Sequence, residues 1–179
     1  GDIAVTTASN SAIPSENWLN DLMTPFINHK NTEVVLGYSH ICYEDMNSIW
    51  RWRREFDDLL TDCQWLGYAL LGMPYRGDGY NLAFKRELFF EHKGYSKSIY
   101  LHSGDDDLFI SEISNGNNTE VVLQTSSILT TLWGRSTTRT WRERKEQYRF
   151  TSRWLRQTPF IRQGATSAMQ WIVTILLCA

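Results

Sequence analysis

Three consecutive carboxylates, Asp105, Asp106 and Asp107, are the residues whose type and spacing are best suited to chemistry. They follow Gly104 and precede an apolar run that predicts a helix over residues 105–114. Acidic side chains at a helix start cap free backbone N–H groups and interact favourably with the helix dipole. Three adjacent acids also repel one another, and crowding raises the basicity of one of them. The tract therefore suits either a helix cap or a general base that accepts a proton.

A second candidate group lies in the glycine-rich loop predicted over residues 72–80. Gly77 and Gly79 allow a ligand to approach the backbone closely. Asp78, between them, is expected to be exposed and to accept hydrogen bonds from sugar hydroxyl groups. Asn81 follows at the start of a predicted strand. The alternative interpretation is a tight turn before a strand, without a binding role.

A third group lies on a basic helix predicted over residues 140–157. Arginine and lysine on one face of this helix could bind a diphosphate, with aromatic side chains beside it. The alternative is a helix at a membrane surface that extends its cations toward the headgroups. The candidate residues are Trp141, Arg144, Lys145, Gln147 and Arg149.

Charge is distributed unevenly along the chain. Residues 1–134 carry 9 basic and 18 acidic residues, a net charge of −9, whereas residues 135–179 carry 9 and 2, a net charge of +7. The acidic larger part argues against nucleic acid as a partner. Residues 163–179 contain no charged residue and are expected to begin a membrane helix, or to form a buried C-terminal helix. Preceding basic residues and three cysteines without zinc or disulfide spacing favour a domain facing the cytoplasm.

The elements that would position these groups alternate along the chain. The pattern predicts an α/β domain over residues 1–162, with a mostly parallel sheet flanked by helices, followed by the start of a membrane segment over 163–179. Residues 11–15 are expected to form a turn. The predicted strands cover residues 3–7, 33–38, 81–85 and 120–124. The further predicted helices cover residues 15–26, 43–71 and 87–92.

Taken together, these pieces resemble the family-2 glycosyltransferases of the GT-A fold, in the bacterial branch with C-terminal membrane helices. The most specific stretches are Pro74–Phe90 and Gly104–Phe109, and the turn Pro14–Trp18 and the basic helix follow the same order. The resemblance runs from about residue 2 to about residue 157. It implies a partial catalytic domain whose N-terminal nucleotide-binding strands are missing before Gly1.

The resemblance implies an inverting transfer of a sugar from a nucleotide-sugar donor to a hydroxyl group of a glycan or lipid-linked acceptor. An aspartate would act as the general base; alignment from Gly104 gives Asp106, and alignment from Leu108 gives Asp105. The residues implied to bind the acceptor are Gly77, Asp78, Gly79, Asn81, Asp107 and Trp141. Those implied to bind the diphosphate are Arg144, Lys145, Gln147 and Arg149.

The family also implies a divalent metal, Mg or Mn, held by an Asp-x-Asp motif after the first strand. This motif falls on Ala8-Ser9-Asn10, where Asn10 offers only a neutral oxygen and a hard dication prefers anionic ones. Two functions are therefore expected. One is an active transferase at the inner membrane with its catalytic domain in the cytoplasm. The other is a catalytically degraded, membrane-attached binding or scaffold relative.

Overall fold

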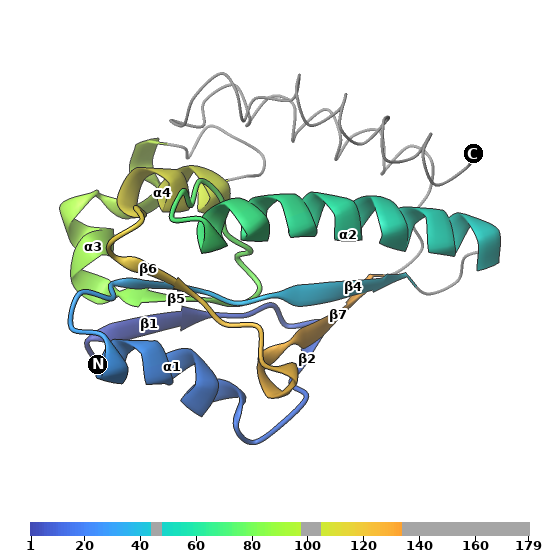
Figure 1. Cartoon of the computed structure of the whole chain (residues 1–179), viewed down its shortest axis with the longest axis horizontal. Helices are drawn as coiled ribbons and strands as arrows, with labels where there is room; N and C mark the ends of the chain where they lie inside the picture. Colours follow the sequence, from blue (N-terminus) through green and yellow to red (C-terminus); the bar gives the residue numbers. More distant parts are fainter. Residues whose placement is uncertain (44–47, 98–104, 134–179) are drawn as a thin grey trace.

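The computed structural model describes residues 1–43, 48–97 and 105–133 of the 179-residue chain. These residues form an α/β structure with helices on both faces of a central sheet region (Figure 1). The strands are β1 (Ile3–Thr6), β2 (Ser11–Ala12), β3 (Val34–Leu36), β4 (Ser39–Tyr43), β5 (Leu82–Lys85), β6 (Thr119–Val121) and β7 (Leu129–Trp133). The α-helices are α1 (Trp18–Asn28), α2 (Ser48–Leu70), α3 (Arg86–Glu91) and α4 (Asp105–Ile113), and the 3-10 helices are η1 (Gly94–Lys97) and η2 (Thr125–Ser127).

The strands form two mixed sheets, so the prediction of a mostly parallel sheet was wrong. The four-stranded sheet has the order β1-β5-β3-β6, and the three-stranded sheet has the order β2-β7-β4. Among the described strands, β5 is antiparallel to both β1 and β3, and β2 is antiparallel to β7. Only β3–β6 and β4–β7 are parallel pairs among them. The long loop between α2 and β5 lets β5 enter the sheet in the reverse direction, which the alternation of strands and helices does not reveal.

Alternation along β3 and β5 divides the interior into two cores. Val34 and Leu36 point to one face with Leu82, and pack there against α2 and α4. Val35 and Ala83 point to the other face and pack against α1. All five side chains are fully buried. Successive residues of a strand face opposite sides, so two short apolar strands are enough to hold helices on both faces.

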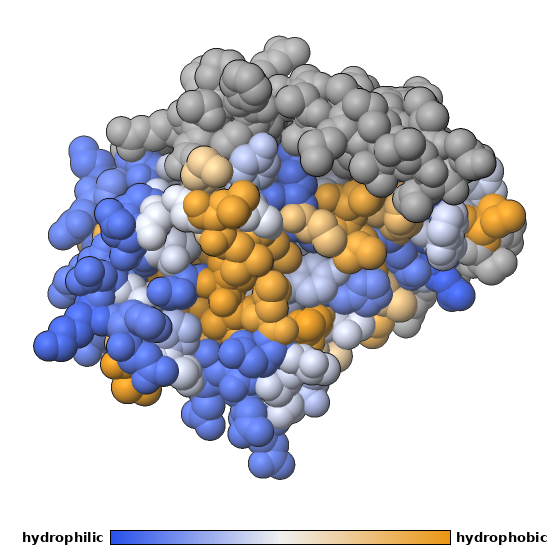
Figure 2. Space-filling view, in the orientation of Figure 1, coloured by the Kyte–Doolittle hydropathy of each residue, from blue (hydrophilic) through white to orange (hydrophobic). Residues whose placement is uncertain are grey.

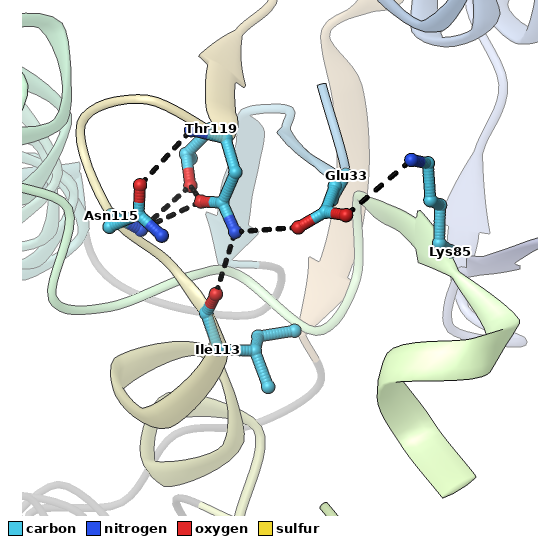
Figure 3. A network of polar contacts seen from close by, with 6 residues as sticks. Glu33, Lys85, Ile113, Asn115 and Thr119 are labelled. Atoms are coloured by element: carbon cyan, nitrogen blue, oxygen red, sulfur yellow. Dashed lines mark hydrogen bonds and ion pairs between the residues drawn. The ribbon is translucent and has the colours of Figure 1, made fainter. Parts of the chain in front are cut away.

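A polar network fixes the C-terminal end of α4 to the sheet (Figure 3). The side-chain amide of Asn118 donates to the carbonyl of Ile113 at 2.9 Å and to Glu33 at 3.1 Å. Lys85 reaches the other carboxylate oxygen of Glu33 at 3.5 Å, and the backbone N–H of Asn115 donates to Asn118 at 2.8 Å. The network joins the end of α4 to β3 and β5. It thereby fixes the direction in which the first turn of α4 points.

Most predicted elements are present, and the differences lie in the three-stranded sheet. The predicted turn at residues 11–15 begins with β2, and β7 was not predicted. Within the predicted helix at 43–71, α2 covers Ser48–Leu70, whereas Tyr43 belongs to β4. Each of these strands is stabilised by a partner distant in sequence, as in the pairing of His40 with Thr130. Local sequence pattern carries no information about such partners.

Some apolar surface remains exposed in the described part of the chain. A band of apolar side chains crosses the middle of one face, between α1 and α2, where the edge strand β6 lies (Figures 1 and 2). Leu123, just after β6, is 42% exposed. Ile49 and Trp52 near the start of α2 are 72% and 65% exposed. The two cores therefore do not enclose all of the large apolar side chains.

Candidate functional site

The two most specific sequence stretches meet in space, although they are about thirty residues apart in the chain. The loop before β5 lies against the first turns of α4. A Cβ atom added at Gly79 would overlap the carboxyl group of Asp106, and one added at Gly77 would press on Ile110 at 2.9 Å. A side chain at Gly77 would therefore press on α4, and one at Gly79 would displace the carboxyl group of Asp106. This close packing brings the glycine-rich loop and the acidic tract into one candidate site.

The acidic tract is divided among different environments. Asp107 is 7% exposed and accepts a charge-assisted hydrogen bond from Nε of Arg76 at 2.9 Å. Burial raises the pKa of Asp107, and the guanidinium of Arg76 offsets part of that rise. The pair joins the loop to α4. Asp107 thus acts first as an anchor, while its predicted contact with an acceptor stays a prediction.

Asp106, one of the two predicted candidates for a general base, is contacted on both of its carboxyl oxygens. One carboxyl oxygen, Oδ1, accepts a hydrogen bond from the hydroxyl of Tyr95 at 3.0 Å, and the other lies against Gly79. Burial raises the pKa of Asp106, and the adjacent charge of Asp105 raises it further. The hydrogen bond from Tyr95 lowers it in part. A partly buried carboxylate with increased basicity suits proton abstraction.

Asp78 is partly buried, so the expectation of an exposed side chain was wrong. Its carboxylate accepts a hydrogen bond from the backbone N–H of Tyr80 at 3.0 Å, which closes the turn before β5. Burial raises the pKa of Asp78, and hydrogen bonds from Tyr80 and the Ser39 side chain lower it in part. The charge of Asp106 contributes to the rise, which places the two carboxylates within electrostatic reach of each other.

Asn81 lies at the junction of the two sheets and is completely buried. Its side-chain oxygen accepts from the indole N–H of Trp18 at 3.0 Å. Its amide nitrogen donates to the carbonyls of Tyr38 at 2.7 Å and Ser127 at 2.8 Å. Both amide hydrogens are used within the protein, so the geometry explains Asn81 as a structural residue. Its predicted role in acceptor binding stays a prediction.

Two further titratable residues belong to the same region and were not predicted. Burial raises the pKa of Asp62 on α2 to about 6, although a hydrogen bond from the indole of Trp65 at 3.0 Å opposes the rise. Tyr38 has its pKa raised to about 12 by burial and by the charges of Asp62 and Asp78 among others. The available signal was the position of Asp62 three residues before the buried Trp65, on the inward face of a helix.

Replacing Asp62 with asparagine is expected to stabilise the chain near pH 7.5 by about 1–3 kcal/mol. The folded-state pKa of about 6 lies above the ordinary value of 3.8, so the folded protein binds the proton more tightly than the unfolded one. Wild-type stability therefore falls as pH rises between these two values. Asparagine does not ionise, so this loss of stability is absent, and its side-chain oxygen can still accept the hydrogen bond from Trp65. Urea unfolding at roughly pH 4 and roughly pH 7.5 measures the difference.

The control for this prediction is Asp57→Asn on the same helix. It removes the same charge from α2 without removing the acceptor of the Trp65 hydrogen bond. The Asp62→Asn gain should vanish near pH 4, where the wild-type carboxyl is already protonated. An equal gain at both pH values would contradict the assignment, because it would show that the effect does not come from ionisation.

The position of the expected metal motif does not fit a divalent cation. Ala8 has no side-chain oxygen, and the side-chain amide of Asn10 donates to the carbonyl of Leu132 at 2.8 Å. Within residues 1–43, 48–97 and 105–133, no group of three or more His, Cys, Asp or Glu side chains is arranged to hold a metal ion. Asn10 therefore serves to join the β2 region to β7.

Several predicted site residues lie outside the described ranges. They are Trp141, Arg144, Lys145, Gln147 and Arg149, together with the predicted membrane segment 163–179. In the part of the chain that is described, no helix is both long enough and apolar enough to cross a membrane. The predictions for diphosphate binding and for the membrane segment therefore stay predictions.

Comparisons with known proteins do not assign the chain to a family. No protein-family model matches it, and no curated protein matches it. The evidence for a function is therefore the geometry of the candidate site, together with the order of sequence motifs that led to it.

Proposed function

We propose that this chain carries the acceptor side of an inverting glycosyltransferase site, with Asp106 as the general base. The observation that supports this most is the contact between Asp106 and Gly79. It joins the two stretches on which the family resemblance rests, and it brings a carboxylate of raised pKa against the glycine-rich loop. Asp106 is preferred over Asp105 because both of its oxygens are positioned by neighbouring residues.

The proposed reaction is a single displacement at the anomeric carbon of the donor sugar. A hydroxyl oxygen of the acceptor forms the new bond to that carbon while its proton passes to Asp106. The bond from the carbon to the diphosphate oxygen breaks, and its electron pair leaves with the nucleoside diphosphate. Attack from the face opposite the leaving group inverts the configuration. Proton removal by a positioned base typically contributes about 10²–10⁴-fold to such a rate.

The roles proposed for the other residues follow from their positions. Gly77 and Gly79 keep the loop backbone close to α4, and Asp78 accepts hydrogen bonds within the same turn. Asp107 anchors that loop through Arg76. The basic segment after residue 134 is proposed to neutralise the leaving diphosphate, and residues 163–179 are proposed to attach the protein to the inner membrane with this domain in the cytoplasm.

A second function is favoured by one observation, the unsuitability of Ala8 and Asn10 as metal ligands. In this alternative the chain binds a glycan or lipid-linked acceptor without transferring sugar to it. Such a module would keep the loop and Asp106, because both belong to the acceptor side, and would lose only the metal-dependent donor side.

An assay of nucleoside diphosphate release distinguishes the two functions. The chain is incubated with uridine- and guanosine-diphosphate sugars, an oligosaccharide acceptor and manganese. The transferase proposal predicts release that requires the acceptor. A chain that releases nothing, but gains release in an Ala8→Asp, Asn10→Asp double variant, would establish the degraded binding relative instead. Absence of release and of acceptor binding in both forms would contradict both functions.

A further inference from the structure

Tyr95 is held in a fixed orientation beside the candidate base. It lies in η1, after a turn in which Lys93 and Gly94 have positive φ values of 60° and 53°. Its ring packs edge-on against Phe89, with centroids 5.4 Å apart, and against Phe109, with centroids 5.5 Å apart. Perpendicular contacts of this kind are favourable and restrict rotation of the ring. The hydroxyl at its end therefore has one preferred position.

That position is within hydrogen-bond distance of Asp106. The hydroxyl donates to Oδ1 at 3.0 Å, while Oδ2 of the same carboxyl group lies against Gly79. The two oxygens thus have different surroundings, one facing η1 and the other facing the loop. The hydrogen bond therefore fixes the plane of the carboxyl group, with one oxygen held on the η1 side and the other on the side of the loop.

We propose that Tyr95 is a positioning residue for the reaction, which holds Asp106 through Oδ1 and directs Oδ2 toward the acceptor. This inference rests on the proposed function, because it assigns Tyr95 a role at that same site. Ring packing against Phe89 and Phe109 already ties η1 to α3 and α4, and phenylalanine would preserve that packing.

Electrostatics at the site agree with this role. Burial raises the pKa of Tyr95, and the negative charge of Asp106 raises it further, so the phenol remains a donor at neutral pH. In return its hydrogen bond lowers the pKa of Asp106. Among the described residues, the other charged groups that act on Asp106 or on its immediate neighbours come from α4 and the loop. They are Asp105, Asp107, Asp78 and Arg76. The hydrogen bond from Tyr95 thus offsets part of the rise in the pKa of Asp106 that Asp105 and Asp107 cause.

The test is Tyr95→Phe, which removes the hydroxyl and keeps the ring. The pKa of Asp106 is measured by carbon NMR titration of its carboxyl group in the whole chain, which requires no activity. We expect the midpoint to rise by about 0.5–1 pH unit, the size expected for loss of one hydrogen bond to the charged form. In the transfer assay, the acidic limb of the pH–rate profile should move up by the same amount. The rate on the high-pH plateau should fall about tenfold, and KM should not change. A loss of this size is expected when a reacting group is slightly misplaced.

Tyr43→Phe is the matched control. Tyr43 also donates to a carboxylate, Asp58, but joins β4 to α2 and does not contact the candidate base. Its loss should lower the melting temperature without moving the Asp106 midpoint. An unchanged Asp106 midpoint in Tyr95→Phe would overturn the inference and leave Tyr95 a purely structural role. A raised midpoint in a chain that never transfers sugar would instead support the contact and contradict the proposed function.

Discussion

Asp106→Asn is expected to lower acceptor-dependent sugar transfer by about 10²–10⁴-fold while leaving the fold intact. Asparagine has nearly the same shape, and its oxygen can still accept from the hydroxyl of Tyr95. It cannot take up a proton at neutral pH. Because burial raises the pKa of Asp106, replacing a partly buried charge with a neutral amide should leave the free energy of unfolding unchanged or higher. Initial rates of nucleoside diphosphate release and urea unfolding measure the two effects.

Asp105→Asn provides the comparison that separates the two candidates for the base. Asp105 contributes negative charge beside Asp106, and its removal should lower the pKa of Asp106. We therefore expect the acidic limb of the pH–rate profile to move to lower pH, while most of the plateau rate is retained. A loss in Asp105→Asn as large as that in Asp106→Asn, or larger, would show that the base was assigned to the wrong carboxylate.

Arg76→Met is expected to destabilise the chain by about 3 kcal/mol at neutral pH. Its guanidinium and the carboxylate of Asp107 have side-chain exposures of 22% and 11%, so removing one partner leaves a nearly buried charge unpaired. The loop would also lose its anchor to α4. The penalty should shrink at low pH, because protonated Asp107 no longer carries a charge. Urea unfolding across the acidic pH range measures both the penalty and its decline.

Two further variants make this prediction specific. Arg76→Met with Asp107→Leu removes both charges, and we expect this double variant to be more stable than Arg76→Met alone. Lys85→Met breaks the pair with Glu33, whose side chains are 36% and 34% exposed, and should cost less than about 1 kcal/mol. A double variant less stable than Arg76→Met, or equal costs at Arg76 and Lys85, would contradict the buried-pair interpretation.

Much of the candidate site could be predicted because its signals are local. A run of three aspartates before an apolar helix and two glycines flanking Asp78 are visible in the sequence. Their structural consequences, α4 from Asp105 and a loop before β5, are both present. The family resemblance assigned Gly79 and Asp106 to one acceptor site, but the contact between them was not predicted, since nothing in either segment specifies the other.

The features that could not be predicted depend on partners far along the chain. The hydrogen bonds of Asn81 to Trp18 and Ser127 could not be predicted, because an asparagine after a glycine-rich turn gives no sign of partners so far along the chain. Asp62 was missed because charged residues of a helix usually face solvent, although its position three residues before Trp65 places both side chains on one face. Strand directions were missed because the antiparallel pairs β1–β5, β3–β5 and β2–β7 each join segments that lie far apart in the chain.

The anomeric configuration of the product tests the central claim most directly, because it reports on attack at the donor carbon. The wild-type chain is supplied with an α-linked nucleotide sugar and acceptor, and the product is examined by proton NMR. A single displacement with Asp106 as the base predicts a β-linked product from the wild-type chain and almost none from Asp106→Asn. A product with retained α configuration, or equal product from both chains, would contradict the account.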